Sequence, residues 1–137
     1  GELFTWRDAG AQGRLAEIIV LDQFSRNMFR DTPQAFAYDP LALILAQESI
    51  RAGCHLQLPL NMRGFMFLPL MHSESPLIHE QALALYTEMG EPHQLEFELK
   101  HKRIIDRFGR YPHRNSILGR VSTAEELAFL QEPDSAF

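Results

Sequence analysis

Proline and glycine divide this chain into segments whose boundaries are typical of helices. Proline is favoured in the first turn of a helix, and glycine directly after the last one. No segment alternates apolar and polar residues over a sustained length, so the sequence predicts no strand. The predicted helices cover residues 8–30, 40–52, 62–70, 76–90, 92–108 and 123–131, with a short helical turn after Thr32-Pro33.

Two boundaries carry more specific predictions. Asn61 is expected to cap the third long helix, and Pro69 is expected to kink or close it, because proline lacks the backbone donor. The sequence Ser122-Thr-Ala-Glu125 indicates a capping box, in which two side chains accept hydrogen bonds from backbone amides at the helix start. Short links between the long segments predict one all-α domain over residues 1–137, built as a stack of antiparallel helical hairpins.

The composition restricts the class of protein. The chain has 137 residues, of which 45% are apolar and ten are Phe, enough to build one core. Its formal net charge of -5 argues against a nucleic-acid partner, because phosphate contacts need a basic surface. Cys54 is the only cysteine, so no intrachain disulfide can form and a reducing, cytoplasmic location is expected. No apolar run approaches the ~20 residues of a membrane span, so no membrane association is expected.

A basic segment, residues 106–120, interrupts this acidic chain. Four arginines and His113 crowd into it, and no acidic residue occurs between Asp106 and Glu125. Because arginine presents a planar fork of donors suited to carboxylates and phosphates, the cluster requires an anion, either within the protein or bound to it. The arginines are Arg107, Arg110, Arg114 and Arg120.

Polar residues also fall on helix faces that are otherwise apolar. With a rotation of about 100° per residue, Asp22 and Arg26 lie in the middle of the apolar stripe of residues 8–30. Further apolar residues occupy the opposite side, so Asp22 and Arg26 are expected to be paired inside the protein. The alternative is an ordinary surface pair on the exposed rim of an amphipathic helix.

His101 lies at the centre of the apolar stripe of residues 92–108. Because unpaired polar groups are costly in a low-dielectric interior, one shared network is expected to satisfy it. A purely structural network, which ties the basic segment to Asp22 and Glu74 and binds nothing, is the alternative. The expected members are Asp22, Arg26, His72, Glu74, His101 and the arginines of the basic segment.

Motifs for metals, cofactors and nucleophiles do not accompany these residues. Neither H-E-x-x-H nor C-x-x-C occurs, and the arginines repel a cation, so no metal is expected. No G-x-S-x-G, G-x-G-x-x-G or Walker loop occurs either, so no cofactor is predicted. Acid–base chemistry by His101 or His113 with Glu74 stays open. The catalytic candidates are His72, Glu74, His101 and His113.

Five stretches form a recognisable set: residues 21–30 (LDQFSRNMFR), 35–39 (AFAYD), 69–74 (PLMHSE), 108–115 (FGRYPHRN) and 118–126 (LGRVSTAEE). In this order they resemble the bacterial domain-of-unknown-function 924 family, helical proteins of tetratricopeptide-like architecture. The resemblance implies a fold and no biochemical activity. Family members carry several tens of residues before the position of Trp6, so the chain is expected to lack N-terminal helices and to expose apolar surface that they would cover. The family-pattern positions are Asp22, Arg26, Asn27, His72, Glu74, His101, Arg110, His113, Arg114 and Asn115.

Three functions remain open from the sequence. The first is a binding domain whose arginine- and histidine-lined pocket holds an anionic small molecule or an acidic peptide end. The second is a small hydrolase- or lyase-type enzyme, and the third is a scaffold with a structural polar network. The predicted ligand-binding residues are Asp22, Arg26, Asn27, Arg110, His113, Arg114 and Asn115.

Overall fold

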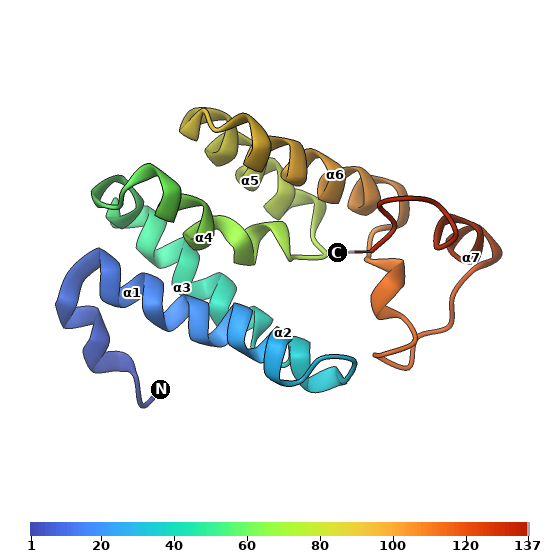
Figure 1. The fold of residues 1–137 in the computed structure, drawn as a ribbon, viewed down its shortest axis with the longest axis horizontal. Coiled ribbons are helices and arrows are strands. Elements are labelled where there is room, and N and C mark those ends of the chain that lie inside the picture. Colours follow the sequence, from blue (N-terminus) through green and yellow to red (C-terminus); the bar gives the residue numbers. More distant parts are fainter. Residues whose placement is uncertain (137) are drawn as a thin grey trace.

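The computed structural model describes residues 1–136 and consists of helices joined by short turns (Figure 1). The predicted all-α class is confirmed, and residues 1–136 contain no strand. The longer helices are α1 (Gly10–Ile19), α3 (Asp39–Arg51), α4 (Leu60–Met71), α5 (Pro76–Met89) and α6 (Pro92–Phe108). The shorter elements are η1 (Phe4–Ala9), the π-helical turn η2 (Val20–Phe24), α2 (Ser25–Met28), η3 (Pro33–Phe36), η4 (Cys54–Gln57), η5 (Pro112–Arg114) and α7 (Ala124–Phe129).

The predicted glycine ends of α5 and α6 are confirmed. Gly90 and Gly109 follow these helices in the left-handed conformation, with φ angles of 72° and 68°. Glycine adopts this conformation without the steric cost of a Cβ atom, so it ends the helix and turns the chain. The turn at Gly109 separates α6 from the rest of the basic segment, residues 110–120.

Three predicted details at helix ends need correction. α4 begins directly after Pro59, so the cap predicted at Asn61 is wrong. The same helix continues through Pro69 to its end at Met71, because a proline in the last turn removes only one hydrogen bond. The capping box is present one residue later than predicted, between Thr123 and Glu126.

The first predicted helix is a continuous helical run from α1 through η2 to α2. Its central turn is π-helical, and such turns occur frequently at functional sites. Asp22 lies in this turn and is 1% exposed, whereas Phe24 and Met28 on the other side are exposed. The predicted burial of Asp22 is therefore confirmed, and the opposite apolar side is open.

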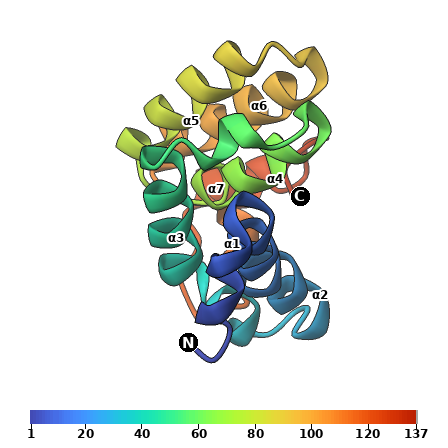
Figure 2. The same cartoon turned by 90° about the vertical axis from the view of Figure 1, so that its left-hand side faces the viewer.

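Consecutive helices pack as neighbours in the stack. α3 packs against α4, α4 against α5 and α5 against α6, while α1 packs against both α3 and α4. In Figure 2, α5 and α6 lie above α4, and α1 and α3 lie below it. This arrangement agrees with the predicted stack of helical hairpins, and its tetratricopeptide-like character stays a prediction.

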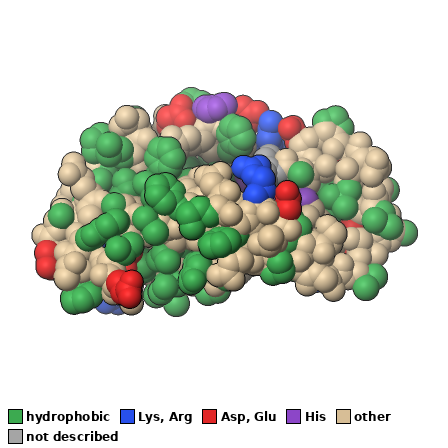
Figure 3. Space-filling model, turned by 60° about the horizontal axis from the view of Figure 1, so that its bottom comes forward, with side chains coloured by type: hydrophobic (Ala, Val, Ile, Leu, Met, Phe, Trp, Pro, Cys, Tyr) green, Lys and Arg blue, Asp and Glu red, His purple; other side chains and the backbone are tan. Residues whose placement is uncertain are grey.

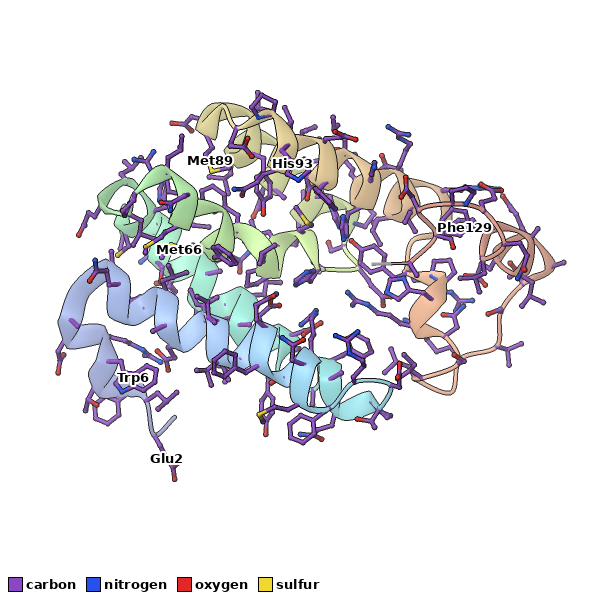
Figure 4. All side chains as sticks on the ribbon, in the orientation of Figure 1. Glu2, Trp6, Met66, Met89, His93 and Phe129 are labelled. Carbon is purple, nitrogen blue, oxygen red and sulfur yellow. The ribbon has the colours of Figure 1, made fainter. Side chains whose placement is uncertain are left out.

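The main core lies between α1, α3, α4 and α5. Ile18, Phe67, Leu70 and Tyr86 are each no more than 1% exposed, and Met66 lies between α4 and α1 (Figure 4). Burial of such a side chain stabilises the fold by about 1.5–3 kcal/mol. A second cluster joins α6 to the basic segment and α7, and it consists of Ile104, Ile105, Tyr111 and Phe129.

Several large hydrophobic side chains remain exposed. They include Phe4, Trp6, Phe24, Met28 and Phe65, and Figure 3 shows hydrophobic side chains gathered over the left part of one face. The expectation that N-terminal helices would cover such surface stays a prediction. Among residues 1–136, no helix combines the length and the apolar character needed to cross a membrane.

Replacing Gly13 with Ala is expected to destabilise the protein by about 1–3 kcal/mol. A Cβ atom at this position would lie 1.7 Å from the backbone oxygen of Trp6. Because that atom belongs to the backbone, η1 would have to move away from α1. Urea denaturation can compare this variant with Gln12→Ala, an exposed neighbour for which no loss is expected. Equal unfolding midpoints would show that η1 is not held against α1 here.

Candidate functional site

A pocket of about 470 Å³ lies where α2, η3, α6 and the basic segment meet. Three arginines and three histidines face it, and the rings of Phe36 and Tyr111 form part of its wall. The polar and charged lining residues other than Tyr111 are Gln23, Arg26, Asn27, Arg30, Asp31, His72, His101, His113 and Arg114.

Asp22 lies behind this lining as the buried centre of a polar cluster. Its Oδ1 lies 2.7 Å from His72 Nδ1 and 2.9 Å from Arg26 Nη1. Gln23 Nε2 donates to its Oδ2 at 2.6 Å. Although burial raises the pKa of Asp22, His72 and Arg26 outweigh burial, and the pKa lies below its usual value. The carboxylate is therefore ionised and compensated from three sides.

Asp39 connects two of the pocket arginines. It accepts two hydrogen bonds of 2.8 Å from Arg26, in the bidentate geometry that suits a guanidinium and a carboxylate. Arg114 Nη1 lies farther away, at 3.6 Å. In the sequence, Asp39 stands out only as the end of the stretch 35–39, directly before the predicted helix 40–52. Nothing local in the sequence indicates its contact with a residue 13 positions earlier.

Arg114 is 6% exposed but has no carboxylate to itself. Its guanidinium carbon lies 4.8 Å from the ring centre of Phe36 and 4.4 Å from that of Tyr111. Nη2 donates to the backbone oxygen of His72 at 3.0 Å, and Nε is buried with no acceptor among the described residues. Burial, together with the nearby charge of Arg26, lowers the pKa of Arg114. Arg114 is thus a buried cation that faces a pocket with incomplete compensation.

The other three arginines of the basic segment have acidic partners of their own. None of them lines the pocket. For these three arginines, the alternative of a purely structural network accounts for the positive charge. Their acidic partners lie after the segment, or many residues before it, in the sequence. For this reason the positive charge of the segment has no nearby acidic residue along the chain. The pairs and their shortest distances are Arg107–Glu125, 2.9 Å, Arg110–Glu126, 2.6 Å, and Arg120–Glu74, 2.6 Å.

The structure separates the predicted ligand-binding residues into two groups. Arg26, Asn27, His113 and Arg114 line the pocket, with Asp22 directly behind them. Arg110 and Asn115 lie outside its lining. Asn115 is 0% exposed and supports the loop, since it donates to Ser122 and accepts from Arg120.

The pocket histidines contribute hydrogen bonding rather than charge near pH 7. Burial, with a smaller contribution from the charge of Arg114, lowers the pKa of His101 to about 3 and that of His113 to about 4. Burial also lowers the pKa of His72, although Asp22 opposes it. The positive charge of the pocket therefore comes from its arginines.

Glu74, the predicted acid–base partner of a histidine, is engaged elsewhere. Its Oε1 accepts a hydrogen bond of 2.7 Å from the backbone amide of Tyr111, and both of its oxygens bind Arg120. Of the four catalytic candidates, the three histidines line the pocket and Glu74 does not. The carboxylate in direct contact with a pocket histidine is that of Asp22, on His72.

A second buried pair, His79 on α5 with Glu98 on α6, was not among the residues predicted from the sequence. Both residues are 0% exposed, and His79 Nδ1 lies 2.8 Å from Glu98 Oε1. Burial raises the pKa of Glu98. The pair ties the two helices together beneath the pocket residue Tyr111, whose hydroxyl lies 3.2 Å from His79 Nε2. No group of three or more His, Cys, Asp or Glu residues in the described part of the chain is arranged to hold a metal ion.

Comparison with known proteins places this architecture in a family. The family model described as a bacterial protein of unknown function (DUF924) matches residues 1–134. The chain belongs to this family. The solved structure of a protein of unknown function from Agrobacterium tumefaciens, ATU0120, is similar to this DUF924 chain, with 41% sequence identity and a TM-score of 0.89. The match covers 95% of the DUF924 chain and 73% of ATU0120. A comparison with curated proteins gives no match, and a shared fold alone assigns no activity.

Proposed function

We propose that the pocket binds an anionic small molecule, with Arg114 as its main contact. The observation that carries this proposal is the incomplete compensation of Arg114, a buried cation that shares the carboxylate of Asp39 with Arg26. An uncompensated charge in a protein interior is costly. A bound anion would remove that cost, and Arg30 at the pocket rim adds a further donor.

The dimensions of the pocket favour a small molecule over a protein surface. Its volume of about 470 Å³ lies within the range of about 300–1,000 Å³ typical of small-molecule sites. The aromatic rings of Phe36 and Tyr111 hold the Arg114 guanidinium in place. A preorganised guanidinium loses less side-chain entropy when it binds an anion.

Acetate or inorganic phosphate at millimolar concentration is expected to raise the melting temperature of the protein. A ligand that binds the native state, and not the unfolded chain, stabilises the protein by mass action. The rise should become smaller as sodium chloride is added, because salt screens the arginine charges. Differential scanning fluorimetry measures both effects. A melting temperature that does not respond to any of these anions at low ionic strength would overturn the proposal.

Variants of single arginines separate binding from folding. Arg114→Ala should abolish the response to anions, and Arg30→Ala, at an exposed position, should weaken it without affecting the fold. Arg107→Ala is the matched control, because Arg107 also stacks on an aromatic ring, that of Phe108 at 4.7 Å, but pairs with Glu125 outside the pocket. An undiminished response in both Arg114→Ala and Arg30→Ala would place the bound anion elsewhere.

A second candidate function, an acid–base enzyme, is favoured by the Asp22–His72 pair. In the tautomer whose Nδ1–H donates a hydrogen bond to Asp22, the His72 ring is neutral and its Nε2 carries no proton. This Nε2 can accept a proton from a bound substrate. A carboxylate that orients a catalytic histidine in this way is common in acid–base sites. Turnover of an anionic compound that is lost in His72→Asn, while binding persists, would favour the enzyme. Binding without turnover would favour the binding domain.

A further inference from the structure

A second hollow, of about 500 Å³, lies beside the arginine-lined pocket. It is formed by α4 and α6, with η2 at its edge. Gln23, His72 and His101 line both the second hollow and the pocket. Because three side chains are common to both, the two spaces meet along one boundary.

The two spaces differ sharply in chemistry. Among the described residues that line the second hollow there is no Lys, Arg, Asp or Glu. Its lining includes Phe65, Leu68, Met71 and Phe97, and two of these side chains are unusually open to solvent: Phe65 is 47% and Phe97 is 38% exposed. Exposed aromatic side chains at the rim of a hollow are typical of ligand-binding grooves.

The shared boundary is polar without being charged. His72 donates toward Asp22 behind the wall, and His101 Nδ1 donates to the backbone oxygen of Phe97. Gln23 is held by its bond to Asp22 Oδ2. A ligand that crosses the boundary would therefore pass from an apolar surface, over neutral polar groups, to the arginines.

We propose that the pocket and the second hollow form one elongated site for a monocarboxylate that carries an apolar chain or ring. The carboxylate binds at Arg114, and the apolar part lies over Phe65 and Phe97. This inference rests on the proposed function, because it takes the arginine pocket as the anion site and adds the class of ligand.

The charges around the pocket favour a singly charged head group. Arg26, Arg30 and Arg114 face it, while Asp31 lines its rim and Asp22 and Asp39 contact Arg26. Three cations against three acids leave no large excess of positive charge. A carboxylate therefore fits this balance better than a phosphate with a charge near -2.

Isothermal titration calorimetry with acetate, butyrate, hexanoate and octanoate tests the inference on the whole chain. Full burial of one methylene is equivalent to about fourfold in affinity. Since the hollow is open to solvent, a smaller gain per methylene is expected, and octanoate should bind at least about tenfold more tightly than acetate. Octanamide, which has the same chain and no charge, should bind at least about tenfold more weakly than octanoate.

A pair of variants on α6 locates the chain of the ligand. Phe97→Ser should remove most of the gain of octanoate over acetate and leave acetate binding unchanged. Leu99→Ser is the matched control, because Leu99 lies on the same helix and is 40% exposed, but lines neither space. Phe65→Ser should act as Phe97→Ser does, which covers the case in which one variant folds poorly.

The remaining outcomes separate failure of this inference from failure of the proposed function. Anions that bind with equal affinity at every chain length would overturn this inference and leave the proposed function intact. Absence of binding by every anion would overturn both. A chain-length effect that survives Phe97→Ser and Phe65→Ser, or equal binding of octanamide, would show adsorption to other apolar surface and would also overturn the inference.

Discussion

Replacing Asp22 with Ala is expected to lower the free energy of unfolding by about 3–5 kcal/mol, the range for a broken buried ion pair. Asp22 is 1% exposed and its carboxylate contacts Arg26, His72 and Gln23. Its removal leaves His72 Nδ1 and Gln23 Nε2 without this acceptor, while Arg26 keeps its bidentate contact with Asp39. The loss exceeds that of a surface pair because the groups left behind stay largely out of water.

Asp106→Ala provides the matched control for this measurement. Asp106 pairs with Lys102 at the same i,i+4 spacing that joins Asp22 to Arg26, but on an exposed helix surface. The expected loss there is at most about 1 kcal/mol. Urea denaturation at pH 7 measures both variants. Equal losses would mean that Asp22 behaves as a surface residue and that the polar cluster contributes little to the fold.

Acidification is expected to destabilise the protein from about pH 6.5 downward. The folded-state pKa of His101 is about 3 and that of His113 about 4, whereas a histidine in an unfolded chain titrates near ~6.5. The unfolded state therefore binds protons first as the pH falls. The stabilising contribution of each neutral histidine is complete above about pH 6.5 and is lost progressively below it, toward the folded-state pKa.

His101→Asn isolates one part of this effect. Asn can still donate to the backbone oxygen that His101 Nδ1 contacts, that of Phe97, but it takes up no proton. Between pH 6.5 and 5, His101 should contribute about 2 kcal/mol of the stability lost by the parent protein, and the variant should lack this share. His93→Asn, on the exposed side of α6, serves as the control and should follow the parent. Parallel pH profiles for His101→Asn and the parent would contradict the depressed pKa.

Local sequence determined most of the secondary structure. Proline and glycine act on the backbone of their own residues and immediate neighbours, so Gly90 and Gly109 fix the ends of α5 and α6 wherever these helices pack. Helix faces follow from rotation per residue, and for that reason the burial of Asp22 and its pairing with the partly exposed Arg26 were predictable. At the start of α4 the prediction was wrong, because the helix begins directly after Pro59 and not at Asn61.

Membership of the candidate site depended on contacts between distant parts of the chain. The four arginines of the basic segment are equivalent in sequence, and only their partners distinguish them. Arg110 contacts Glu126 on α7, and Arg120 contacts Glu74 in the turn between α4 and α5. Arg114 stacks on two aromatic rings and shares the Asp39 carboxylate with Arg26.

The sequence by itself determined the helical class, the positions of most helix ends and the need for an anion near the basic segment, since these follow from backbone geometry and from charge. The tertiary structure alone decided which charges are already compensated. Electrostatic interactions depend on distances in space and on burial, and neither is set by spacing along the chain. Packing of the basic segment beside η3 places Arg114 in the wall of a pocket. Packing of the same segment elsewhere pairs each of the other three arginines with a carboxylate.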